Sequence, residues 1–232
     1  MKFKLSWVVF LLFFFFCGQT VLGGNLPSET ASTPDDSSLT LDEIMDRVEK
    51  HYAGSGFSAD FYQTSTIKAM EITDSASGKA FFKRPGKMRW EYETPDRQMI
   101  ITDSSTLWVF RPEDNQVMIG KAPSFFKDGK GFSFLADMKV IKQKFNIGLE
   151  TEPKDDSFTL KLLPKEKTYD LVEIYLGISK KTFDIVRIVT YNSYGDETRI
   201  VFNSIQFKQE LDDGMFVFSV PEGIEVLSLD EQ

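Results

Sequence analysis

The chain has 232 residues, one cysteine and a formal net charge of −8. An acidic chain of this kind is not expected to bind nucleic acid through a basic surface, and one cysteine excludes an internal disulfide and a thiolate metal cluster. Barrels and sandwiches of about 200 residues are common as single domains, so one folded domain is expected.

Residues 1–24 have the pattern of a secretory signal peptide. Lys2 and Lys4 give a positive start, and the apolar stretch Leu5–Cys17 follows. This stretch is shorter than the roughly 20 residues of a membrane-spanning helix, although an uncleaved anchor is an alternative. Phe16 stands where a lipoprotein signal needs a small residue before its cysteine. We therefore expect cleavage after the leader and export of a chain without cysteine.

Residues 25–38 are expected to be a disordered linker, because Pro27–Ser38 is rich in Ser, Thr, Pro and Asp. A folded domain is expected over residues 39–230. Its first element is a helix that begins at Thr40, where Glu43 completes a capping box. The apolar stripe on this helix predicts that one face packs against an apolar surface; it consists of Leu41, Ile44, Val48 and Tyr52.

From Phe57 the apolar residues recur with a period of two, which predicts strands. A turn is predicted at Asp74–Gly78, and the segment Phe81–Phe110 is predicted to form a meander of short strands. Further strands are predicted at Val117–Ile119, Phe158–Leu163, Leu171–Ile178, Ile185–Tyr191, Thr198–Phe207 and Phe216–Val220. Many short strands with little helix between them indicate a mainly β fold, an incomplete antiparallel barrel or strongly curved sheet.

The meander places Met88, Trp90 and Tyr92 on one strand face. Large rings on one face form either a packed core or the wall of an apolar cavity, and the residues alone leave both open. Strand parity does not decide which face of Leu107–Phe110 points inward, since both faces are apolar. The candidate cavity wall consists of Phe61, Met88, Trp90, Ile101, Trp108 and Phe110.

The segment Pro123–Met138 interrupts the strand pattern and predicts a mobile loop followed by a short apolar helix. Together with the first helix, it would cover the apolar face. The candidate covering residues are Leu41, Ile44, Val48, Phe125, Phe126, Phe132, Phe134 and Leu135.

Catalytic chemistry has little support in the sequence. His51 is the one histidine, and neither a G-x-S-x-G motif nor a P-loop accompanies it. Asp155-Asp156 and Asp212-Asp213 are acidic pairs inside predicted turns, where Asp is favoured for turn geometry alone. We expect no catalytic residue, no metal site and no cofactor; a hydrolase using Asp and His is the enzyme alternative.

Three motifs resemble one known family. K-R-P-G-K-M-R-W-E-Y (residues 83–92), P-D-R-Q (95–98) and L-W-V-F-R-P-E (107–113) are similar to the periplasmic carriers that move lipoproteins to the bacterial outer membrane. Phe57–Gln63 resembles the F-x-A-x-F-x-Q strand of that family. One departure is Asp103–Thr106, where the family usually has an Asp-Gly hairpin; it puts the turn type in doubt.

The resemblance implies a half-barrel whose helical lid covers an apolar cavity, and it implies that the arginine of K-R-P latches the lid when the cavity is empty. That role would fall to Arg84. From residue type, Arg84 lies beside apolar Phe82, where its guanidinium is costly to bury unless its donors are used. An exposed strand arginine next to Lys83 is the other interpretation.

The function implied is that of a monomeric periplasmic chaperone, with a β-barrel-like lipid-binding fold, in outer membrane biogenesis. It would accept acylated lipoproteins from an inner-membrane lipoprotein-releasing ABC transporter and deliver them to an outer-membrane lipoprotein receptor, without enzymatic activity. Two alternatives share the fold: the outer-membrane acceptor of the same pathway, and a periplasmic binding protein for free lipid or glycolipid.

Overall fold

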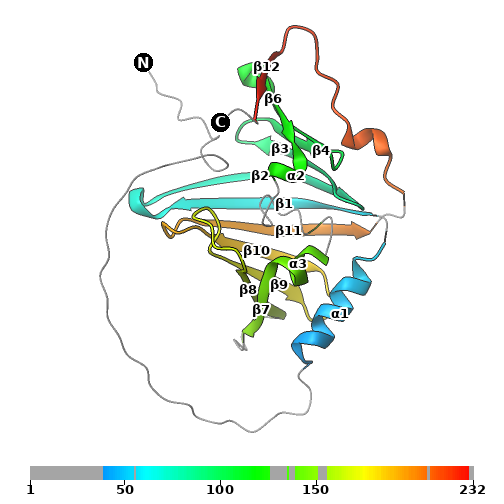
Figure 1. Ribbon diagram of the computed structural model, residues 1–232, viewed down its shortest axis with the longest axis vertical. Coiled ribbons are helices and arrows are strands. Elements are labelled where there is room, and N and C mark those ends of the chain that lie inside the picture. The colour runs from blue at the N-terminus through cyan, green and yellow to red at the C-terminus, as the bar shows by residue number, and fades with distance from the viewer. Residues whose placement is uncertain are drawn as a thin grey trace. The chain divides into compact units, whose positions relative to one another are not determined.

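The computed structural model describes residues 39–54, 56–125, 135, 139–150, 156–207 and 210–229 (Figure 1). The predicted leader and linker lie outside these residues, so both stay predictions. Leu39–Gln232 forms one compact unit. Within it, one large curved sheet carries the short helices.

Helix α1 (Leu41–His51) begins as the sequence predicts. Thr40 Oγ1 accepts a hydrogen bond from the backbone N of Glu43, and the Glu43 carboxylate accepts one from the backbone N of Thr40. This reciprocal capping box satisfies two backbone donors at the helix start. The predicted stripe is confirmed, since Ile44, Val48 and Tyr52 are buried.

The sheet has twelve strands in the order β12-β6-β5-β4-β3-β2-β1-β11-β10-β9-β8-β7. It is curved and does not close into a barrel (Figure 1), which confirms the predicted fold class. The strands are β1 (Gly56–Ile67), β2 (Ile72–Lys83), β3 (Lys87–Thr94), β4 (Gln98–Thr102), β5 (Thr106–Arg111), β6 (Gln116–Lys121), β7 (Phe145–Glu150), β8 (Ser157–Pro164), β9 (Glu173–Ser179), β10 (Ile185–Tyr191), β11 (Glu197–Phe207) and β12 (Glu225–Ser228). The helical segments besides α1 are α2 (Ala122–Phe125), α3 (Lys139–Lys144) and 3-10 turns at Lys68–Met70, Pro112–Asp114 and Asp213–Phe216.

The turn predicted at Asp74–Gly78 is wrong, because these residues lie inside β2. The chain reverses instead at the 3-10 turn Lys68–Met70, followed by Glu71 in the left-handed conformation (φ 54°). Small and polar residues at 74–78 resemble a turn in composition, but Ala76 is buried and continues the alternation of the strand. The composition thus reflects a need for small side chains on one face.

The strand predicted at Phe216–Val220 is also wrong. Asp212 caps a 3-10 turn by accepting a hydrogen bond from the backbone N of Gly214, and Phe216 is the buried residue of that turn. Val217 and Val220 are exposed. Strands β7 and β12 were not predicted, and β12 pairs with β6 in parallel, unlike the antiparallel pairs of the rest of the sheet.

The turn between β4 and β5, where the sequence departs from Asp-Gly, is held by side chains. The Asp103 carboxylate accepts hydrogen bonds from the backbone N of Ser105 (2.8 Å) and Thr106 (2.7 Å). Ser104 takes the positive φ of 86° that glycine would otherwise supply. The hairpin therefore forms without glycine, through an Asp side chain that substitutes for backbone acceptors.

Candidate binding site

One face of the sheet carries a continuous row of aromatic rings beneath α1; we call it the inner face. The Tyr52 ring of α1 lies 5.1 Å from the ring of Phe57, measured between centroids, and Phe57 stacks on Phe82 at 4.6 Å. Trp90 continues the row, 5.6 Å from Phe82 and 4.9 Å from Phe61. The row is buried, with Phe61, Phe82 and Trp90 at most 3% exposed.

Small residues on β2 make this row possible. Register places Gly78 between Phe61 of β1 and Tyr92 of β3, yet the two rings lie 5.0 Å apart across the glycine. A Cβ at Gly78 would lie 1.9 Å from the backbone oxygen of Glu91, so no side chain fits there. The small residue on β2 thus lets rings from its two neighbouring strands meet above it.

The residues predicted to line an acyl-chain wall divide between the two faces. Phe61, Met88 and Trp90 are on the inner face. Trp90 pairs with Ile100 across β4, so Ile101 lies on the opposite, outer face, and its partner Trp108 does too. Phe110, two residues after Trp108, shares that outer face.

The expectation that Ile101, Trp108 and Phe110 line the same wall as Trp90 is therefore corrected. Leu107 and Val109 are the inner-face residues of β5, as their cross-strand partners Thr102 and Ile100 show. Both faces of β4 and β5 are apolar because both are covered. Such strands lack the alternation of apolar and polar residues that would identify the inward face from the sequence.

The outer face of β3–β6 is covered by the C-terminal segment. The Phe110 and Phe218 rings are 4.9 Å apart, and Phe216 is fully buried. The Arg89 guanidinium of β3 donates to the backbone oxygen of Met215 (3.0 Å). Two further cations, Lys83 and Lys87, pair with Asp213 at 2.6 and 2.8 Å.

Helix α1 is held to the turn between β9 and β10 by side chains at its C-terminal end. His51 Nε2 lies 2.7 Å from Asp184 Oδ1, and the Ile185 backbone N donates to the Tyr52 hydroxyl at 2.9 Å. The Arg47 guanidinium lies 5.1 Å from the centre of the Phe183 ring. His51, which has no catalytic setting in the sequence, is thus an anchor of the helix; an acidic partner 133 positions away could not be found from sequence spacing.

Arg84 lies in the turn between β2 and β3, two residues after Phe82, and is half-buried. Burial raises the pKa of Tyr52, and the positive charge of Arg84 opposes that rise. The sequence predicted that Arg84 lies beside the apolar wall, and in the structure it follows the end of β2, the strand that carries Phe82.

The other covering residues are described in part. Leu135 is buried, as is Ile141 of α3. Leu41 is half-buried, whereas the side chain of Phe125 and all of Phe126, Phe132 and Phe134 lie outside the described residues. Lys142 of α3 contacts Asp46 and Glu49 of α1, each at 3.3 Å, so α1 and α3 are joined at their exposed surfaces.

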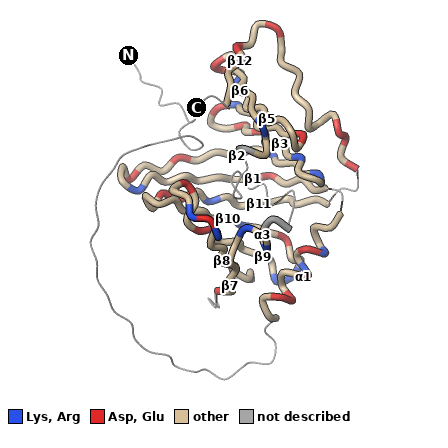
Figure 2. The backbone as a smooth tube through the Cα atoms, in the orientation of Figure 1, with Lys and Arg blue, Asp and Glu red and all other residues tan. Residues whose placement is uncertain are grey.

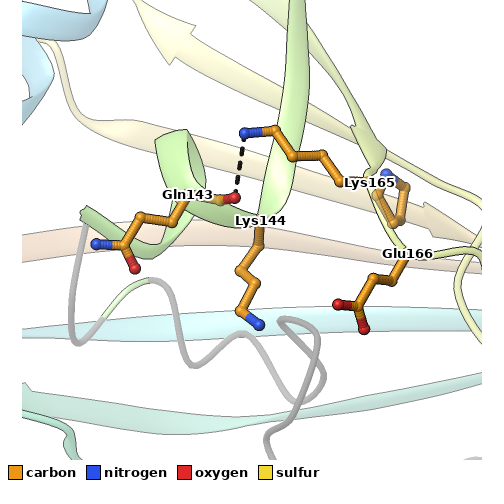
Figure 3. A pocket seen from close by; sticks show the side chains of 5 residues that line it. Gln143, Lys144, Lys165 and Glu166 are labelled. Carbon is orange, nitrogen blue, oxygen red and sulfur yellow. Dashed lines mark hydrogen bonds between the residues drawn. The ribbon is translucent and has the colours of Figure 1, made fainter.

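A polar pocket of about 320 Å³ lies where α3 ends, lined by Gln143, Lys144, Pro164, Lys165 and Glu166 (Figure 3). Lys165 donates to the backbone oxygens of Lys142 (3.0 Å) and Gln143 (3.1 Å). These are carbonyls of the last helical turn, which a cation stabilises. We assign this pocket to the capping of α3.

Basic and acidic residues are interspersed along the described elements (Figure 2). Within the ranges given above, no helix is long and apolar enough to cross a membrane. The same residues contain no cluster of three or more His, Cys, Asp or Glu side chains that could hold a metal ion.

Comparisons with known proteins agree with the fold. Residues 54–219 match the family model described as outer membrane lipoprotein carrier protein LolA. An outer-membrane lipoprotein carrier protein of Chromobacterium violaceum is 32% identical, over 75% of this chain and 81% of the relative. One from Nitrosomonas europaea is 30% identical, over 74% and 82%.

A crystal structure of an uncharacterized conserved protein from Thermus thermophilus has the same fold. It superposes with a TM-score of 0.51 at 14% sequence identity, covering 81% of this chain and 98% of that one.

Proposed function

The chain belongs to the outer membrane lipoprotein carrier family, and from that premise we propose that it is a periplasmic chaperone for acylated lipoproteins. It accepts lipoproteins at the inner membrane from an ABC transporter, shields their acyl chains from water, and passes them to an outer-membrane receptor. Export through a cleaved signal peptide, with residues 25–38 as linker and residues 39–230 as a monomeric carrier domain, is part of the proposal.

The observation that carries this proposal is the aromatic row of the inner face. It lies beneath α1, a helix that is held by a few side-chain contacts. Phe61, Met88 and Trp90 present rings and a thioether with little polar specificity. Acyl chains gain about 0.8 kcal/mol for each buried methylene. A carrier that recognises hydrocarbon alone can therefore serve many lipoproteins that share one lipid anchor.

Binding requires the covering helices to part from this face. The lid consists of α1 with Leu41, Ile44 and Val48, and of the segment after β6, with Leu135 and the phenylalanines 125, 126, 132 and 134. In the closed form α1 occupies the surface that the acyl chains need. Ligand affinity is then reduced by the free energy of opening, which keeps release to a tighter acceptor favourable.

Arg84 is proposed as the latch of this lid. It follows the buried ring of Phe82, and its charge acts on Tyr52 at the end of α1. A guanidinium offers five donors in a planar fork, enough to hold several acceptors of a helix end. Arg84 would thereby favour the closed form and keep the affinity for lipid moderate.

Release from spheroplasts tests the function. Spheroplasts with radiolabelled lipoproteins are mixed with the exported chain, and the soluble fraction is analysed for complexes. We expect one-to-one complexes that do not form with unacylated cargo. Free lipid in the protein without lipoprotein release would favour the lipid-binding alternative, and no bound lipid of either kind would mean that the aromatic row is only a core.

Replacing Arg84 tests the latch. The Arg84→Leu variant should still accept lipoproteins but should fail to transfer them to outer membranes, because an unlatched cavity holds lipid more tightly. Arg97→Leu is the matched control, since Arg97 is an exposed arginine in the next hairpin. Normal transfer by Arg84→Leu would contradict the assignment.

A further inference from the structure

Three polar side chains contact one another on the largely apolar inner face. The Tyr92 hydroxyl donates to Gln63 Oε1 at 3.0 Å, and Gln63 Nε2 donates to Ser65 Oγ at 3.1 Å. Gln63 is 8% exposed and Ser65 is 1% exposed. We call these three residues the polar triad.

The triad belongs to the same surface as the aromatic row. Gln63 pairs across the sheet with Ala76 of β2 and Ile200 of β11, both buried. The ring of Tyr92 packs edge-on against Phe61 at 5.0 Å, and burial raises the pKa of Tyr92. The triad therefore extends the row of rings, at the end of β1 away from α1.

Burial of such groups is unfavourable unless their hydrogen-bonding capacity is used. The triad uses part of it. Gln63 has two N–H donors, of which one reaches Ser65, and the Ser65 hydroxyl accepts that bond while its own proton has no acceptor among the described residues. Two donors, one N–H of Gln63 and the O–H of Ser65, are thus left over within the described part of the chain.

We infer that the polar triad is a subsite for the ester carbonyls of a bound acyl ligand. A carbonyl oxygen offers two lone pairs and no proton, and so complements a site with unused donors. The inference rests on the proposed function, since it assumes that acyl chains enter along the inner face. The subsite would add a polar contact to the recognition of hydrocarbon. This contact would fix how far the acyl chains extend along the inner face.

Two probes with chains of eight carbons isolate the carbonyl, because they differ only in whether the carbon next to the glycerol oxygen is a carbonyl or a methylene. Dioctanoylglycerol carries two esters, whereas dioctylglycerol carries ether links and no carbonyl. Each is titrated against the whole exported chain by displacement of an apolar fluorescent dye. Wild-type protein should prefer the ester probe by roughly three- to tenfold, the size of one net hydrogen bond. The ratio of the two affinities is the readout, because general loosening of the fold affects both probes alike.

The variants Ser65→Ala and Gln63→Met should bring this ratio close to one. Thr66→Val is the matched control: it removes a hydroxyl from the same strand on the outer face, where Thr66 contacts Thr73. It should leave the ratio unchanged. Circular dichroism and urea unfolding identify a variant that fails to fold, and Ser65→Ala, the smaller change, is the variant on which the conclusion depends.

Each outcome bears on a different statement. Equal affinity of wild-type protein for both probes overturns the ester subsite and leaves the carrier function standing. A preference that survives in both variants overturns the assignment to Gln63 and Ser65. Binding of neither probe overturns the subsite and the proposed function together.

The ester carbonyls have two sources in an envelope, acylated protein and free glycerolipid. A synthetic diacylglyceryl-cysteine lipopeptide, titrated beside dioctanoylglycerol, separates them. Tighter binding of the lipopeptide assigns the carbonyls to protein cargo, and equal or weaker binding assigns them to glycerolipid; a loss of lipopeptide affinity in Ser65→Ala supports the subsite in both cases.

Discussion

The two apolar faces of the sheet are covered in different ways. The inner face meets α1 where the Tyr52 ring contacts Phe57 of β1, and the described anchors of α1 are side chains near its C-terminal end, such as His51 with Asp184. The outer face lies under the C-terminal segment, which adds a β ladder to β6 and pairs Asp213 with two lysines. A cover held by a few side chains can separate from the sheet at lower cost than one held by backbone pairing. The inner face is thus suited to exchange of its cover, and the outer face to permanent burial.

Truncating a ring on the outer face should have the largest effect on stability. Phe216→Ala removes a fully buried ring and should lower the free energy of unfolding by about 3–5 kcal/mol. Urea denaturation measures the change. Val217→Ala is the control, because Val217 is exposed and its loss should alter stability little. An equal loss from both variants would mean that the C-terminal segment is not a fixed cover.

Hydrogen exchange should separate the two covers. We expect amides of α1 to exchange at least tenfold faster than those of β6, because local opening of the lid is easier than loss of the ladder. Adding a lipopeptide should change exchange in α1 and leave β12 unchanged. Coincident rates in α1 and β6, with and without ligand, would remove the distinction between an exchangeable and a permanent cover.

The contact of His51 with Asp184 should contribute about 1 kcal/mol to the closed lid, because both side chains are partly exposed and such pairs are screened by solvent. A double-mutant cycle with His51→Gln and Asp184→Asn measures the coupling from urea denaturation. The matched pair is Lys79 and Glu93, which are more exposed and 4.0 Å apart; their coupling should be smaller. If the cycle measures no coupling energy between His51 and Asp184, their contact is not an anchor of α1.

The smallest effect should come from acid. Hydrogen bonds from Lys83 and Lys87 lower the pKa of Asp213 to about 2. A carboxyl with a depressed folded-state pKa stabilises the fold above its unfolded value, and that contribution is lost as pH falls toward the folded value. Stability should therefore decline slightly more between pH 4 and 2 in wild type than in Asp213→Asn. Parallel pH profiles of the urea midpoint would contradict this.

The sequence predicted elements that depend on local signals. The capping box of Thr40 and Glu43 and the stripe through Ile44 and Val48 involve neighbours within one or two helical turns. The strands β1 and β3 followed from the alternation of apolar residues. These features are encoded within about ten residues, which is the range that periodicity covers.

Other features depend on partners distant in the chain. Ile101 and Trp108 were assigned to the wrong face because β4 and β5 are apolar on both sides, and the cause is a C-terminal segment more than 100 residues later. Strand β2 was mistaken for a turn at Asp74–Gly78 because its small residues serve the rings of β1 and β3. The polar triad was missed since Gln63 and Tyr92 meet only after three strands pair.

The return of the chain to β6 also bears on self-association. An open sheet has two edge strands, and an exposed edge with free backbone groups can pair with another copy. Strand β6 would be such an edge, but Glu225–Ser228 pairs along it and is itself only four residues long. The new edge is short and begins with Glu225, whose charge disfavours pairing between copies. On this side of the sheet, we thus do not expect the sheets of two copies to join edge to edge.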